Sequence, residues 1–270
     1  MSSGERKEGA CQMNMSFYSA AVGAYQQQLR MDVQANNIAN VNTQGFRCER
    51  AAFGELMNRD VEGINGNNLP KGTGARMIHA PIDFTSRGFK ETGMEFDFAI
   101  NGDGFFAVYD LATQEISFTR DGAFEMNEFL IPPAEDAEPE YDENGELIEP
   151  QATSVWRLSD NFGRCVLDPQ GNFIVIDPEN RGADLDVGVF DYAIHYGMQH
   201  TSDNRLIPTD VNGQLYLGTG TVVRGLLEMS NTDLTQEFIK VIESQRAFSY
   251  CLRMVTTTDE IETTFNNLRG

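Results

Sequence analysis

Both ends of the 270-residue chain carry the apolar spacing of a long amphipathic helix, and this feature restricts the fold more than any other. Apolar and small residues follow one another at intervals of three and four from about residue 16 to 38, and again from 233 to 268. This spacing places them on one face of a helix. We predict that the two faces bury each other or the matching faces of neighbouring copies. The N-terminal face contains Phe17, Ala21 and Ala24 with Leu29 beside it, and the C-terminal face contains Leu234, Phe238, Val241, Phe248, Leu252 and Val255.

The predicted helix ends carry residue types that start and stop helices. Asp233 precedes the second helix and, with Glu237, places negative charge near its N-terminus, where the helix dipole favours it. Asn37, Asn40 and Gly45 mark the end of the first helix, because these residue types tolerate turns and left-handed conformations. The apolar pattern of the second helix has one polar position, Gln245. The pattern shifts in phase near residues 256–259 and resumes with Ile261, Phe265 and Leu268.

Two helices at opposite ends of a chain are costly to pair within one isolated molecule. Loop closure and the ordering of both segments reduce the stability of such a pair. We therefore expect the ends to be disordered in the monomer and ordered in an assembly. When a face on one copy contacts a different face on the next, the contact repeats without closing and generates a helical tube. The pattern predicts a filament subunit.

Between about residues 96 and 223 the apolar period shortens to two, which is typical of strands. We predict one hairpin that turns at Asn101-Gly102, between strands at 96–100 and 105–109, and a second that turns at Asp121-Gly122. Two further Asp/Asn-plus-Gly turns, at 168–171 and 210–213, precede apolar segments at 173–176 and 215–217. The predicted fold class is α+β: the N- and C-terminal helices form a coiled coil, and the central part of the chain forms an all-β domain.

The domain prediction follows from these changes of pattern. Residues 1–14 are a polar leader predicted to be disordered, 15–50 hold the N-terminal helix, 51–95 form a connector, 96–224 form the β domain, and 225–270 hold the C-terminal helix. Residues 132–150 contain eight acidic residues, no basic residue and four prolines, and we predict a solvated insertion there. A calcium site at 142–145 is the weaker alternative, because the oxygen ligands lack the required spacing.

Charge and hydropathy exclude several classes of function. A formal charge of −21 repels nucleic acid and anionic lipid. No apolar run is long enough to cross a bilayer, so no membrane insertion is expected, and no segment resembles a cleaved secretory signal. The four cysteines, at positions 11, 48, 165 and 251, lack the spacing of a zinc or redox motif and are expected to be unpaired thiols.

Catalytic motifs are also missing. The chain has no G-x-S-x-G, H-E-x-x-H or phosphate-binding loop sequence. His195 and His200 lie five residues apart without a carboxylate at a ligand-like interval, and turn formation accounts for Asp103 and Asp121. Gly218-Thr219-Gly220 lacks the third glycine of a nucleotide-binding turn. We predict a protein that is not an enzyme and that uses no cofactor or metal.

Five segments resemble the flagellar rod and hook protein family. Residues 35–47 (ANNIANVNTQGFR) are similar to its N-terminal signature, 97–108 (DFAINGDGFFAV) and 118–124 (FTRDGAF) to its β-domain motifs, and 225–233 and 238–260 to its C-terminal block. The GDGFF and EMSN sequences resemble the distal-rod type more than the proximal-rod or hook types, whereas residues 132–200 resemble no named segment.

This resemblance implies how the predicted parts are used. It implies an axial coiled coil of the two ends inside a tube, an outer β domain, and contacts with other copies and with other rod and hook subunits. It also implies export without a cleaved signal by the flagellar type III apparatus, and a location in the basal body. In that reading Asn37, Asn40 and Gly45 set the turn that leaves the first helix, and Phe46 packs beneath it. A hook-type axial protein is the alternative within the family; a coiled-coil chaperone or adaptor and a β-domain enzyme are alternatives from other classes.

Overall fold

The structure is a computed structural model, and it describes residues 15–55, 59–62, 68–71, 75–131, 140–141, 147–148, 153–180 and 185–269. The chain divides into two compact units. The first unit contains residues 1–41, 48–83 and 232–270, and the second contains 42–47 and 84–231. The predicted leader at 1–14 and the candidate calcium segment at 142–145 lie outside the described residues.

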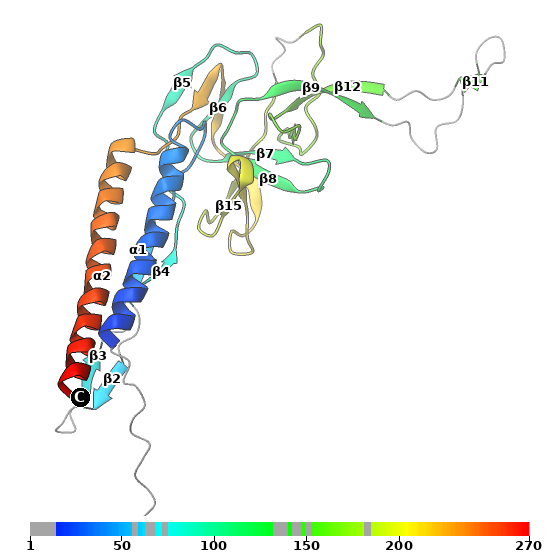
Figure 1. Cartoon of the computed structure of the whole chain (residues 1–270). Helices are drawn as coiled ribbons and strands as arrows, with labels where there is room; N and C mark the ends of the chain where they lie inside the picture. Colours follow the sequence, from blue (N-terminus) through cyan, green and yellow to red (C-terminus); the bar gives the residue numbers. More distant parts are fainter. Residues whose placement is uncertain are drawn as a thin grey trace, which may run out of the picture. The chain divides into compact units, whose positions relative to one another are not determined.

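The first unit is built on the two predicted terminal helices. They are α1 (Met15–Ala39) and α2 (Leu234–Arg269), and they pack side by side (Figure 1). The predicted start of the second helix is confirmed, because Oδ1 of Asp233 accepts hydrogen bonds from the backbone N–H groups of Thr235 and Gln236 at 3.0 and 3.3 Å. The helix α2 continues through residues 256–259 without a break.

Strands from the predicted connector belong to this unit as well. The strands β1 (Ala52–Glu55) and β4 (Ala75–His79) pair antiparallel, as do β2 (Arg59–Glu62) and β3 (Asn68–Lys71). Oε1 of Gln26 on α1 accepts the backbone N–H of Met77 at 2.6 Å. This bond attaches β4 to α1.

The second unit is an antiparallel β domain, so the predicted α+β class is confirmed. Its main sheet runs in the order β15-β16-β8-β7-β13-β12-β9, and β14 pairs with both β7 and β17. The strands of this sheet are β7 (Phe105–Tyr109), β8 (Ile116–Thr119), β9 (Glu125–Ile131), β12 (Thr153–Ser159), β13 (Cys165–Val166), β14 (Val189–Tyr192), β15 (Gln199–Thr201), β16 (Arg205–Ile207) and β17 (Leu215–Leu217).

Three smaller strand pairs complete the unit. The strand β6 (Phe98–Asn101) pairs with β18 (Thr221–Arg224), and β5 (Phe89–Glu91) pairs with β19 (Leu226–Glu228). The third pair, β10 (Glu140–Tyr141) with β11 (Leu147–Ile148), lies in the acidic insertion. A short 3-10 helix, Ser202–Asn204, connects β15 to β16.

The core of the second unit explains the short apolar period in the sequence. The central strand β7 contacts β8 on one edge and β13 and β14 on the other, and its first four residues are buried. Side chains from seven segments meet there: Phe98, Ile100, Phe106, Val108, Phe124, Leu158, Val166, Ile174, Ile176, Val187 and Val189.

Both predicted hairpins are wrong. The strand at 98–101 pairs with β18 and not with β7, and β8 pairs with β7 and β16 and not with β9. The glycines serve close packing instead of hairpin turns. A Cβ atom on Gly122 would lie 1.7 Å from the carbonyl oxygen of Phe98, and one on Gly102 would lie 3.2 Å from the Cα of Gly220.

The other two turns are present. Gly171 N–H donates to the carbonyl of Asp168 at 3.0 Å, which closes the turn at 168–171, and residues 173 and 175 then form isolated bridges but no named strand. The turn at 210–213 leads into β17, as predicted.

Candidate functional site

The contact between α1 and α2 follows a strict seven-residue pattern on α2. Seven buried or half-buried residues of α2 follow one another at intervals of four and three, and Lys240 and Ala247 are half-buried beside them. We call the seven the inner row: Glu237, Val241, Ser244, Phe248, Cys251, Val255 and Thr258. One heptad position is apolar, at 241, 248 and 255. The other is polar or small, at 237, 244, 251 and 258. The inner row therefore combines apolar packing with hydrogen bonding.

Polar pairs fix the register of the two helices. Ser244, which is fully buried, donates from Oγ to Oε1 of Gln34 on α1 at 3.1 Å. Nearer the end of α1, Nδ2 of Asn37 lies 3.4 Å from Oε2 of Glu237. A Cβ atom on Gly23 would lie 3.3 Å from Sγ of Cys251. Because lower numbers on α1 face higher numbers on α2, the helices are antiparallel.

The structure separates the predicted site residues by burial. Ala24, Asn37, Gly45 and Phe46 are buried; Leu29, Asn40, Val241, Phe248 and Val255 are half-buried; Phe17, Ala21, Leu234, Phe238 and Leu252 are exposed. The role of these residues in an assembly interface stays a prediction. Of the six residues predicted for the apolar face of α2, three belong to the inner row and the other three are exposed.

Much of the apolar surface of α2 is exposed outside the inner row. Leu234, Phe238, Ile242 and Leu252 form a first exposed row near the start of the helix, with exposed fractions of 40 to 51%. A second exposed row covers the later part of the helix on another face and contains Tyr250, Met254, Ile261, Phe265 and Leu268. A helix that is apolar on several faces is normally buried on several faces.

The chain leaves α1 through a tightly packed turn. Asn37 bridges the backbone of Glu49 in both directions, at 2.8 and 2.9 Å, and Nδ2 of Asn40 donates to the carbonyl of Asn36 at 2.9 Å. Gly45 has φ of +63°, and a Cβ atom there would lie 2.3 Å from the carbonyl carbon of Arg120. Only glycine fits this position.

Three charged residues from three of the sequence motifs meet in the second unit. Glu228 accepts from Nη2 of Arg47 at 2.7 Å and from Nη1 of Arg120 at 3.1 Å. All three side chains are at least 95% buried. The arginines also donate to backbone carbonyls, Arg47 to Thr85 at 2.9 Å and Arg120 to Gly102 at 2.8 Å. We call this cluster the motif triad.

The motif triad carries a net positive charge in a buried place. Burial lowers the pKa of the Arg120 guanidinium, and Glu228 acts in the opposite direction. Sequence reasoning did not select these residues. The available signal was a charge inside an otherwise apolar motif, as in residues 225–230 (GLLEMS). The triad joins the segments that carry the family motifs.

A second polar cluster surrounds Asp121. Burial raises the pKa of this carboxyl to about 6, and Asp160 and Asp97 act in the same direction, whereas the backbone N–H of Ala123 opposes them. Nearby, Arg164 pairs with Asp160 at 2.5 Å and with Asp203 at 3.4 Å. Asp121 itself is half-buried, and its Oδ1 accepts the backbone N–H of Ala123 at 3.1 Å.

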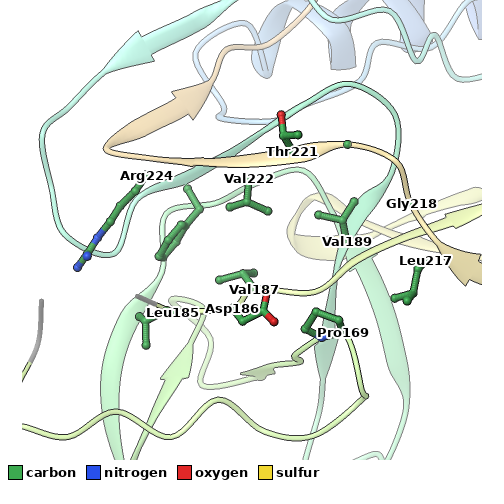
Figure 2. A pocket seen from close by; sticks show the side chains of 12 residues that line it. Pro169, Leu185, Asp186, Val187, Val189, Leu217, Gly218, Thr221, Val222 and Arg224 are labelled. Atoms are coloured by element: carbon green, nitrogen blue, oxygen red, sulfur yellow. The ribbon is translucent and has the colours of Figure 1, made fainter. Parts of the chain in front are cut away.

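The β domain also contains one sizeable pocket among its described residues. Its volume is about 450 Å³, and Figure 2 shows side chains from three parts of the unit around it. Phe98, Val187 and Val189 of the core form part of its lining, together with Leu217 and Val222. The pocket contains no group of His, Cys, Asp and Glu residues that could bind a metal ion; none was found elsewhere in the described ranges either.

The histidines have structural contacts. Nε2 of His195 lies 2.6 Å from Oδ1 of Asp191, and the His200 ring stacks on Phe46 at 5.5 Å while its Nε2 lies 3.0 Å from the carbonyl oxygen of Arg47.

Neither of the two described helices combines the length and the apolar character needed to span a membrane.

Three family models match the segments described above. Residues 17–47 match the model for flagella basal body rod proteins, 99–129 match the flagellar hook protein FlgE/F/G D1 domain, and 223–268 match the flagellar basal body rod FlgEFG protein C-terminal model. The three models thus cover α1 and its exit turn, the center of the β domain, and α2.

Whole-chain similarity distinguishes rod from hook proteins. The chain is 29% identical to the basal-body rod protein FlgG of Bacillus subtilis, over 95% of this chain and 100% of that protein. It is also 29% identical to FlgG of Buchnera aphidicola subsp. Baizongia pistaciae, over 91% and 96% of the two chains. The hook protein FlgE of Borreliella burgdorferi matches only 45% of this chain and 29% of its own length, at 36% identity. This chain belongs to the flagellar basal-body rod protein family.

Membership in the rod family accounts for the sites described above. The family is structural and not enzymatic, in agreement with the prediction from the sequence. The motif triad unites Arg47, Arg120 and Glu228, which lie within or beside all three matched segments. The hook-type alternative is less well supported, because the rod relatives match along nearly their entire length.

Proposed function

We propose that this chain is a structural subunit of the distal rod and that it assembles through α1 and α2 with further copies and with other axial subunits. The observation that carries the proposal is the apolar surface of α2 that α1 leaves exposed. The two exposed rows lie on different faces, so each helix pair can contact more than one neighbour. Repeated contacts between unlike faces build a tube without closing into a ring.

The proposal extends to the route of the chain and its final location. We propose export through the flagellar type III apparatus without a cleaved signal, and residence in the basal body. The similarity to FlgG proteins along the chain supports this reading. A soluble chaperone or adaptor would use the same helices, but it would not be a lasting part of purified basal bodies.

Exposed apolar residues provide the direct test. Phe238→Asp and Leu252→Asp place a charge on the first exposed row, where both side chains are accessible in the single chain. We expect both variants to fold and to be lost from purified basal bodies, because an unpaired carboxylate is costly to bury in an interface. Thr257→Asp, on an exposed polar position of the same helix, is the matched control.

Three measurements decide the outcome: the amount of chain in purified basal bodies, the urea midpoint of the β domain, and swimming motility. Loss of incorporation with an unchanged midpoint supports the proposal. Normal incorporation of both row variants would contradict the interface, and absence of the unmodified chain from basal bodies would contradict the proposed function as a whole.

A further inference from the structure

Two loops at one end of the β14–β17 strand pair form an ordered projection of the second unit. Residues 193–198 follow β14, and 208–214 precede β17; we call these two loops the tip. Asn212 joins them and is fully buried. Its Nδ2 donates to the carbonyls of Ile194 and Tyr196 at 2.6 and 3.1 Å, and its Oδ1 accepts the N–H of Thr209 at 2.6 Å. The tip is therefore shaped before any partner binds.

The surface of the tip is apolar. Tyr196 and Val211 are each 57% exposed, and Ile194 is 48% exposed. Asp210 is the exposed acidic residue of the tip, while His195 is half-buried beside Asp191. A preformed apolar surface loses little side-chain entropy on binding, which favours its use as a contact.

A pocket of about 450 Å³ lies at the other end of the same strand pair (Figure 2). Val189, at the start of β14, and Leu217, at the end of β17, both line it. Arg224 lies at the edge of the lining, where its Nε donates to the carbonyl of Glu95 at 2.5 Å, and Asp186 supplies the opposite charge. The lining thus combines apolar side chains with about as much polar surface, and Asp186 and Arg224 leave it without net charge, whereas the chain as a whole carries −21.

The register of the strands sets the tip and the pocket at opposite ends. Phe190 pairs with Leu217 next to the pocket, and Tyr192 pairs with Leu215 next to the tip. A projection at one end and a hollow at the other suit contacts between copies that follow one another along the strand direction. Such a contact joins unlike surfaces and repeats without closing.

We propose that the tip of one copy inserts into this pocket of the next copy, with Val211 and Tyr196 entering the apolar part and Asp210 facing Arg224. The contact rests on the proposed function, because it requires many copies in one assembly, but it belongs to the β domain and is independent of α1 and α2. The tip and the pocket carry little net charge, so they can approach each other, whereas the net negative charge of the chain as a whole makes its copies repel one another.

Cysteine cross-linking tests the contact in the assembled full-length chain. The pair Val211→Cys and Val222→Cys is placed in one chain, expressed in the bacterium that encodes it in place of the unmodified gene, and oxidised in purified basal bodies. We expect a ladder of dimers and longer oligomers, because Val211 belongs to the tip whereas Val222, on β18, lines the pocket at the opposite end of the β14–β17 pair, so the two cysteines link only different copies. Each single variant and the unmodified chain, with its own four cysteines, are the controls.

Charge exchange provides the second arm. Asp210→Arg and Arg224→Asp are each expected to reduce incorporation at least tenfold, and the double exchange is expected to restore it. Tyr196→Asp should reduce incorporation to the same degree, whereas Phe162→Asp should not, since Phe162 is 63% exposed on another loop of the same unit. Urea midpoints measured for every variant establish that the β domain still folds.

The outcomes separate this contact from the proposed function. If the unmodified chain is incorporated but the cysteine pair gives no oligomers, or the single charge exchanges have no effect, or the double exchange fails to restore incorporation, the contact is wrong and the proposed function stands. Cross-links to a different protein in place of a second copy would also overturn it. Absence of the unmodified chain from basal bodies would overturn both.

Discussion

Asn37 and Glu237 are 200 residues apart in the sequence, yet Nδ2 of Asn37 lies 3.4 Å from Oε2 of Glu237 in the buried contact between α1 and α2. Glu237 also accepts from Nζ of Lys240 at 2.6 Å, and Asn37 holds the backbone of Glu49. One amide therefore connects both terminal helices and the segment that follows the exit turn.

Replacing this amide should loosen the helix pair. Asn37→Ala leaves the Glu49 backbone groups without their partner, and we expect a loss of roughly 2 kcal/mol, or about 30-fold in the opening equilibrium. Amide hydrogen exchange in α1 measures this change. Asn36→Ala, an exposed position next to it, is the control; equal exchange rates in the two variants would contradict the role assigned to Asn37.

The motif triad should be sensitive to the loss of its only carboxylate. Glu228→Gln leaves two buried guanidinium groups without a counter-charge, and we expect a loss of about 3 to 5 kcal/mol in the free energy of unfolding of the β domain. Urea unfolding followed by the single tryptophan, Trp156, measures it. Exposed Glu91→Gln is the matched control.

A triple replacement tests whether the loss comes from uncompensated charge. Changing Arg47 to Met, Arg120 to Leu and Glu228 to Leu removes all three charges together, and it should cost less than Glu228→Gln alone. A triple variant that is less stable than the single variant would show that the arginine bonds to backbone carbonyls matter more than charge balance.

Asp121 should make the β domain less stable as the pH rises. Its pKa is raised from 3.8 to about 6, so the folded state binds the proton more tightly than the unfolded state does. The stabilising effect of the proton is complete below pH 3.8 and is lost as the pH rises to 6 and above. At pH 7, Asp121→Asn should therefore be more stable than the unmodified chain by up to about 3 kcal/mol.

The difference between the two unfolding curves, taken from pH 3.5 to 7.5, measures this effect and cancels the other titrating groups. It should be close to zero at the acid end and grow through the window between the two pKa values. Glu179→Gln, at an exposed position, should give no such trend. A flat difference for Asp121→Asn would show that the carboxyl is not destabilised by burial.

Phe248 tests the inner row. Phe248→Asp should leave the β domain folded and block incorporation, because the carboxylate would enter the contact between α1 and α2. Ser249→Asp, at the exposed position next to it, should be tolerated in the isolated chain. Motile cells that carry complete basal bodies with Phe248→Asp would refute this prediction.

The sequence predicted the helices well because their signals are local. The bounds of α1 and α2, the cap at Asp233 and the turn before β17 follow from spacings within a few residues. The inner row was harder to predict, since α2 is apolar on several faces and the face that contacts α1 carries Glu237, Ser244, Cys251 and Thr258. A search for the most apolar face selects Leu234, Phe238 and Leu252, which are exposed.

The β domain shows why other predictions failed. Gly102 and Gly122 lie in dipeptides that favour hairpins, but here they allow two backbone segments to pass closely, which depends on residues far away in the sequence. The motif triad depends in the same way on positions 47, 120 and 228. No local spacing reveals that three separate charges share one buried site.

The polar residues that recur every seven positions along α2 have a consequence for how such a subunit can be built. Hydrogen-bonded groups select the matching surface and its alignment, but they contribute little net free energy to the contact. Within one molecule, the hydrogen bonds of α2 thus align it with α1, while its most apolar faces stay exposed for contacts with other subunits. The stabilisation of each subunit therefore increases as the assembly grows.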